Sequence, residues 1–158
     1  MTARIARITT LLAPALMACC FGVWDPAPAP KPVERGPDDE RKTAEWRASV
    51  TAFVKDAKTA VEGLKVDDAA TRKREVVRVR EALARIPGEP LGDPKEMEIV
   101  GKQTVIESNA RTVVERIEAI AAKRDRDEPV DAKALRDVQH ILAEIEADPF
   151  LRGDGDKD

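Results

Sequence analysis

"WRASVTAFVKDAKTAVEGL", residues 46–64, contains the repeat that predicts the fold of this chain. Its apolar and small residues recur at alternating steps of four and three, which places them along one face of an α-helix. The members of this stripe are Trp46, Val50, Phe53, Ala57, Ala60 and Leu64. Because such a face is stable only when it is buried against other helices, the stretch predicts one long helix of a helical assembly.

Three further segments of the chain show the same spacing. The second stripe consists of Val76, Val79, Leu83 and Ile86. The third is the longest and consists of Ile99, Gln103, Ile106, Ala110, Val113, Ile117 and Ile120. The fourth consists of Ala134, Val138, Ile141 and Ile145. Short connections between amphipathic helices favour antiparallel neighbours, so we predict an all-α fold: an antiparallel bundle of about four helices in the order long, short, long, short.

Capping residues predict where these helices begin and end. Asp67 and Asp68 interrupt the first stripe and are expected to cap the second helix. "DPKE", residues 93–96, has the order of an N-cap, a first-turn proline and an acid, and is expected to start the third helix. Pro129 is expected to open the fourth helix and Pro149 to stop it.

The chain is therefore divided into four parts. Residues 1–18 are expected to be a signal peptide, residues 19–37 a linker, residues 38–149 the helical domain and residues 150–158 a disordered tail. The pattern leaves the arrangement of the helices open, because two extended hairpins or a dimer sharing a larger core would use the same spacing. A duplicated hairpin also stays open, since "REVVRVREAL" and "RDVQHILAEI" align at an offset of 62 residues.

The composition argues against several classes of function. Charged residues make up 36% of the chain and aromatic residues 3%, and the formal net charge is −3. Residues 1–18 contain two arginines and no acid, so the side chains of the remainder carry −5. Because nucleic-acid binders usually carry a basic excess, we expect no nucleic-acid partner.

Residues suited to catalysis are scarce. Histidine occurs once, at His140, and serine twice, at Ser49 and Ser108, so a Ser–His–Asp triad would have to include His140. "DVQH", residues 137–140, is half of the carboxylate–histidine motif of di-iron bundles, which need a second histidine. We therefore predict a protein that is not an enzyme and that uses no cofactor and no metal.

The N-terminus carries the pattern of an export signal. Residues 1–7 contain two arginines and no acid, and residues 8–18, "ITTLLAPALMA", are mostly apolar. A basic stretch followed by about 7–15 apolar residues is typical of a secretory signal. The run is too short for a transmembrane helix, which needs about 20 residues. A cytosolic N-terminus with a chance apolar patch is the alternative.

The two cysteines are adjacent, at Cys19 and Cys20, which argues against most uses of a cysteine pair. Adjacent Cα atoms lie about 3.8 Å apart, whereas disulfides prefer about 4.4–6.8 Å, so a bridge between them would be strained. A zinc site needs about four ligands, and a thioredoxin-type site needs a Cys-x-x-Cys motif that the chain lacks. The pair is therefore expected to serve another purpose.

"LMAC", residues 16–19, resembles the lipobox of bacterial lipoproteins, in which an aliphatic residue, a tolerant position and a small residue precede a cysteine. The resemblance implies that Cys19 receives a diacylglyceryl group, that the chain is cut just before it, and that the new amino group is acylated, as with palmitate. The alternative register, "MACC", places a cysteine where the family has Gly, Ala or Ser. The resemblance therefore favours Cys19 over Cys20.

"DPAPAPKPVERGP", residues 25–37, contains five prolines and is expected to be an extended, semi-rigid tether. With the lipobox resemblance, it implies a membrane-anchored lipoprotein of the cell envelope, in the outer membrane and facing the periplasm, with membrane lipid as the partner of acylated Cys19. The expected function is a binding or scaffold module for an envelope protein or peptidoglycan. The alternatives are a periplasmic carrier of a small ligand or metal, and a secreted helical protein without lipid.

"RKREVVRVR", residues 72–80, is the densest basic run and the candidate interaction surface. Its cations are Arg72, Lys73, Arg74, Arg78 and Arg80, and they are interrupted by one acid. A solvated helix face with no partner is the favoured interpretation of such a run. The alternative is a surface that contacts anionic lipid headgroups, peptidoglycan or an acidic partner.

Overall fold

A computed structural model describes residues 36–92 and 97–153. Within these ranges every element of regular secondary structure is a helix. They are α1 (Pro37–Gly63), α2 (Ala69–Ala84), α3 (Met97–Arg124), α4 (Ala132–Ala147) and the single turn α5 (Pro149–Arg152). The first four contain 27, 16, 28 and 16 residues. The predicted all-α fold and its long–short–long–short order are therefore confirmed. Pro37, expected to end the linker, instead begins α1, so the helical domain starts one residue earlier than predicted. Cys19, the rest of the predicted tether up to residue 35 and the predicted cap at 93–96 lie outside the described residues.

Aspartate side chains fix the starts of the two short helices. Asp68 accepts hydrogen bonds from two backbone N–H groups of the first turn, one of them that of Thr71, and is the N-cap of α2, as predicted. Asp131 accepts a bond of 2.8 Å from the N–H of Lys133 and is the N-cap of α4. The prediction that Pro129 opens the fourth helix is wrong, because capping by Asp131 leaves Pro129 in the preceding loop.

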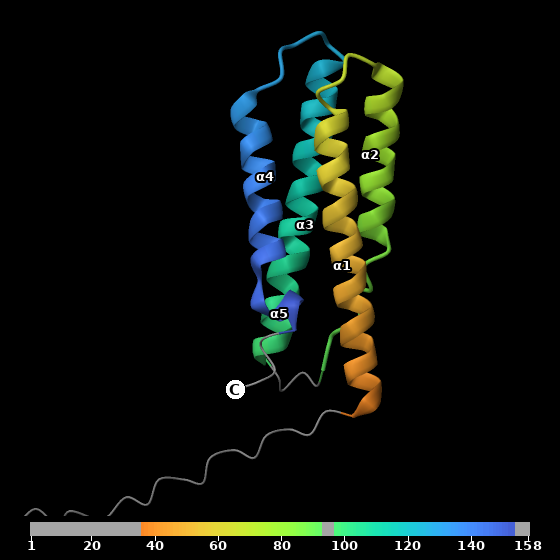
Figure 1. Cartoon of the computed structure of the whole chain (residues 1–158), viewed down its shortest axis with the longest axis vertical. Helices are drawn as coiled ribbons and strands as arrows, with labels where there is room; N and C mark the ends of the chain where they lie inside the picture. Colours follow the sequence, from red (N-terminus) through yellow and green to blue (C-terminus); the bar gives the residue numbers. More distant parts are fainter. Residues whose placement is uncertain (1–35, 93–96, 154–158) are drawn as a thin grey trace, which may run out of the picture. The chain divides into compact units, whose positions relative to one another are not determined.

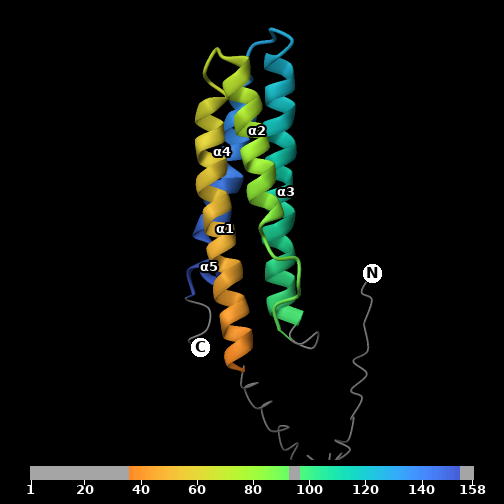
Figure 2. The same cartoon turned by 90° about the vertical axis from the view of Figure 1, so that its right-hand side faces the viewer.

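Helices α1 to α4 lie side by side within one compact unit (Figures 1 and 2). Both α1 and α3 contact α2 and α4, and they also contact each other. Among the described helices, none is both long enough and apolar enough to span a membrane.

The stripe predicted on α1 lies at the centre of the core. All six of its residues are fully buried, with exposed fractions of 0%. They form one cluster with the predicted stripe of α3, including Ile106, Val113 and Ile117. Eight buried apolar residues of the described ranges lie outside the predicted stripes: Val54, Val61, Ala82, Leu91, Val114, Ala121, Leu142 and Phe150. Six of them widen the stripes of their helices, whereas Leu91 lies in the loop after α2 and Phe150 in α5.

The unequal helix lengths explain why Leu91 and Phe150 are needed. At about 1.5 Å per residue, α1 and α3 are roughly 40 Å long, whereas α2 and α4 are roughly 24 Å long. The first halves of the long helices are therefore covered by other parts of the chain. On one side, the backbone N–H of Leu91 donates to Gln103 Oε1 at 2.9 Å. On the other, the rings of Trp46 and Phe150 lie 5.8 Å apart between centroids.

This packing corrects the predicted end of the domain. Residue 149 was expected to be the last of the helical domain, with a tail from 150 onward. Instead Pro149 begins α5, Asp148 accepts a bond of 2.8 Å from the N–H of Phe150, and the Phe150 side chain is only 3% exposed. The packed domain therefore extends through Arg152. Residues 154–158 lie outside the described residues.

Candidate functional site

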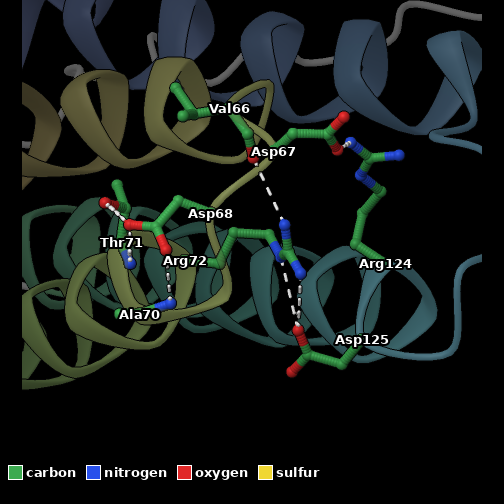
Figure 3. Close-up of polar contacts among 8 residues, drawn as sticks. All are labelled: Val66, Asp67, Asp68, Ala70, Thr71, Arg72, Arg124 and Asp125. Atoms are coloured by element: carbon green, nitrogen blue, oxygen red, sulfur yellow. Dashed lines mark hydrogen bonds and ion pairs between the residues drawn. The ribbon is translucent and has the colours of Figure 1, made fainter.

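The candidate basic run lies on α2, and its first cation is not on the surface. Arg72 is 7% exposed, and its Nε and Nη2 atoms donate to Asp125 Oδ1 at 3.3 and 3.0 Å. Its Nη1 atom donates to the Val66 carbonyl at 3.3 Å (Figure 3). The prediction that Arg72 belongs to an interaction surface is therefore corrected: it joins α2, the loop after α1 and the end of α3.

The same loop is held by a second ion pair. Arg124, near the end of α3, pairs with Asp67, next to the Asp68 cap (Figure 3). The hydrogen bond from the Thr71 hydroxyl, followed by the backbone N–H bonds, holds the pKa of Asp68 below its usual value. Together the two pairs, Arg72–Asp125 and Arg124–Asp67, form what we call the polar clasp, which joins α2 and the α1–α2 loop to the end of α3.

Glu75 is the acid within the basic run, and it is buried. It is 6% exposed and lies between two guanidinium groups, at 3.5 Å from Arg74 Nε and 3.3 Å from Arg78 Nη1. Arg78 also lies 3.2 Å from Asp56 of α1. A Cβ atom at Gly63 would lie 2.6 Å from Glu75 Cγ, so the glycine allows α2 to approach α1 closely here. Glu75 therefore forms its ion pairs with Arg74 and Arg78 where α1 and α2 pack closely.

Arg80 is used between α2 and α3. Its guanidinium pairs with Glu118, and this hydrogen bond holds the pKa of the Glu118 carboxyl below its usual value. The sequence placed Arg80 among the surface cations, but gave no sign of its partner, which lies 38 positions along the chain. Arg78 and Arg80 thus connect α2 to its two neighbouring helices.

Two cations of the run project from the surface without a cross-helix partner in the described ranges. Lys73 is exposed and forms no ion pair with any described residue. Arg74 has a side chain that is 71% exposed, and its ion pair is with its chain neighbour Glu75. Val77, on the next turn, is 44% exposed. These three residues, Lys73, Arg74 and Val77, form what we call the α2 patch, which offers positive charge around one apolar side chain.

The residues considered for catalysis are not assembled into a site in the described part of the chain. His140 has a side chain that is 75% exposed, and its Nε2 atom lies 3.2 Å from Glu144. The Ser49 hydroxyl donates to the Glu45 carbonyl at 2.9 Å. Within residues 36–92 and 97–153, no group of three or more His, Cys, Asp or Glu residues is placed to hold a metal ion.

Gln103, the one strongly polar residue of the third stripe, is buried in a network that sequence reasoning did not identify. Its amide nitrogen donates to the Glu89 carbonyl at 3.0 Å and to Glu107 Oε1 at 2.9 Å. The same Glu107 oxygen accepts a bond of 3.2 Å from Trp46 Nε1. The network joins α1, α3 and the loop after α2. Gln103 and Glu107 therefore hold these three parts of the chain together.

These contacts leave the α2 patch as the remaining candidate from the basic run. No protein-family model, no curated protein and no solved structure matches this chain.

Proposed function

We propose that the chain is a lipid-anchored protein of the cell envelope whose helical unit is a binding or scaffold module. The observation that carries the proposal is the "LMAC" sequence ending at Cys19, directly after a basic and then apolar N-terminus. Two or more acyl chains hold a protein stably on a membrane, since each buried CH₂ contributes about 0.8 kcal/mol. In this proposal, membrane lipid is the partner of Cys19.

The proline-rich segment supports the same proposal. At about 3.1 Å per residue, residues 20–36 would reach roughly 50 Å from the anchor. This length would carry the helical unit clear of lipid headgroups, and it suits a protein in the outer membrane that faces the periplasm. The helical unit would then reach an envelope protein or peptidoglycan while acylated Cys19 stays in the membrane.

The packing of the helical unit supports a module that acts through its surface. In the proposed arrangement, α1 to α4 form an antiparallel bundle. The cluster between them is built from Val, Ile, Leu, Ala and aromatic side chains. Binding would therefore use the outer face, where the α2 patch combines Lys73, Arg74 and the half-exposed Val77. Such a patch would give weak, salt-sensitive contacts to an anionic partner.

The anchor is tested by mass analysis of the membrane fraction. The mature chain should start at Cys19 and carry acyl chains. Cys19→Ala should leave the precursor uncut, whereas the neighbouring Cys20→Ser should be processed normally. A Cys19→Ala chain that is still acylated would refute the assignment. A wild-type chain that is cut but carries no lipid would support the alternative of a secreted helical protein.

The surface is tested separately by sedimentation with isolated peptidoglycan. The double variant Lys73→Glu/Arg74→Glu should bind less than the wild type, and added salt should reduce wild-type binding. The matched control is Lys55→Glu/Arg136→Glu, which reverses two exposed cations that form no ion pair with any described residue. Equal loss in both double variants would show a general charge effect and would count against the α2 patch.

A further inference from the structure

A small pocket lies between α3, α4 and the loop that joins them. It has a volume of about 150 Å³. Its apolar wall is formed by Ala119, Ile120, Pro129, Val130 and Ala134. Its charged rim is formed by Arg116, Lys123, Asp131, Lys133 and Asp137. None of these residues belongs to the polar clasp or to the α2 patch, so the pocket is a separate feature of the molecule.

The backbone turn after α3 builds one wall of this pocket. The N–H of Glu128 donates to the Lys123 carbonyl at 3.1 Å, and the N–H of Asp127 donates to the Arg124 carbonyl at 3.1 Å. This pair of bonds is the Schellman motif, which ends a helix with one residue in the left-handed conformation. Asp127 is that residue, with a φ of 58°. The turn reverses the chain, so that Pro129 lines the same pocket as residues of α3.

Both carboxylates of the rim are already used within the protein. Asp131 accepts the N–H bond that caps α4. Asp137 Oδ2 lies 3.2 Å from Arg116 Nη1 and 3.5 Å from Lys133 Nζ. Lys123, in contrast, is exposed and forms no ion pair with any residue of the described ranges. The rim therefore carries three cations against two acids, and Lys123 supplies the positive charge that has no partner there.

The size and charge of the pocket together define a ligand class. An apolar cavity of about 150 Å³ in another protein is large enough to hold benzene. A single surplus positive charge beside such a wall complements a single anionic group on an apolar body. We propose that this pocket binds a small free carboxylic acid in its ionised form, with an apolar body about the size of benzene and its carboxylate directed to Lys123.

The affinity expected for such a ligand is weak but measurable. A ligand of about ten non-hydrogen atoms in an open pocket reaches a dissociation constant on the order of 1 mM. The contribution of Lys123 is screened, because the side chain is exposed. Its removal should therefore weaken binding about three- to fivefold. Raised salt should weaken binding in the same direction.

The test is a titration of the full ¹⁵N-labelled chain with 4-methylbenzoate, followed by amide chemical shifts. Shifts should concentrate at Ile120, Lys123, Val130 and Ala134 and should saturate. The neutral analogue 4-methylbenzyl alcohol should bind several-fold more weakly. Lys123→Gln should weaken 4-methylbenzoate binding about three- to fivefold. The control Lys55→Gln removes an exposed lysine on α1 and should leave binding unchanged.

A second variant tests the apolar wall. Ala119→Leu adds bulk at an exposed lining residue and should abolish the localised shifts, and circular dichroism shows whether the helices are retained. If that variant unfolds, Lys123→Gln still decides the question. Shifts spread over the whole chain, or shifts that do not saturate, would overturn the proposal. So would equal binding of 4-methylbenzoate to Lys123→Gln and Lys55→Gln, or equal binding of the acid and the alcohol to the wild type.

Discussion

Arg72 is the residue whose substitution distinguishes a structural role from a surface role most sharply. Its neighbour Lys73 has the same charge and lies on the same helix, but Arg72 is buried and Lys73 is exposed. Replacement of Arg72 by alanine removes the two bonds to Asp125 and the bond to the Val66 carbonyl. We therefore expect Arg72→Ala to lower the free energy of unfolding, and Lys73→Ala to leave it nearly unchanged.

The size of the effect follows from the surroundings of Arg72. The Asp125 side chain is 55% exposed, so solvent limits the ion pair to about 0.5–1 kcal/mol. The Val66 carbonyl loses its hydrogen-bond donor. Because Val66 is exposed, water can replace that donor, and the loss costs only about 0.5 kcal/mol. The two buried methylenes beyond Cβ contribute about 0.8 kcal/mol each. Alanine has no long side chain to order on folding, and this entropy difference offsets about 1 kcal/mol. The free energy of unfolding should therefore fall by about 2 kcal/mol.

Urea unfolding followed by far-ultraviolet circular dichroism measures this loss. Arg72→Met keeps an apolar stem and should lose about 1 kcal/mol, since only the polar bonds are removed. Lys73→Ala should stay within about 0.5 kcal/mol of the wild type. If Arg72→Ala and Lys73→Ala unfold at the same urea concentration, the bonds to Asp125 and Val66 do not stabilise the fold and the reasoning fails.

Three further substitutions test other parts of the structure. Phe53→Ala should cost about 3–5 kcal/mol, because Phe53 is fully buried in the core; a urea midpoint near that of the wild type would contradict this. Asp127→Gly should raise the free energy of unfolding by about 0.5–1 kcal/mol, because glycine adopts the observed φ of 58° without strain; a lower melting temperature would argue against the turn. The hydrogen bond from the Thr71 hydroxyl lowers the pKa of Asp68 below its usual value. The stability that the charged carboxylate adds is therefore present above the unfolded-state pKa and is lost as pH falls through the folded-state pKa. Asp68→Asn should therefore show a shallower loss of stability in acid, and an unchanged acid profile would contradict the capping role.

Spacing in the sequence was enough to predict the helices and most of the core. The alternating steps of four and three from Trp46 to Leu64 identify residues that are all fully buried. The same rule fails for Phe150, because this residue lies beyond a proline and belongs to no periodic segment. Its burial depends on the gap left by the short α4 beside the long α1, which is a property of the assembled helices.

The candidate site was less predictable, since charge in a sequence does not show its partner. Arg72 extends the second stripe backward by one step of four from Val76, and this spacing was the available signal that it points inward. Arg80 stands at the same step of four after Val76, but this spacing does not identify its partner Glu118, which is brought close only when α2 packs on α3. The cations of a basic run can therefore be assigned to an interaction surface only after those that pair with neighbouring helices have been identified and excluded.

The mismatch in helix length has a mechanical consequence. Half of α1 and half of α3 are covered by a loop and a single turn, so this end should open locally at a lower free energy than the part held by four helices. Amide protons of residues 37–45 should exchange faster than those of residues 53–61. A pulling force transmitted through the chain before Pro37 would enter the molecule at this weaker end. It would separate Trp46 from Phe150 first, so we expect the thinly covered half to yield under load while the other half stays folded.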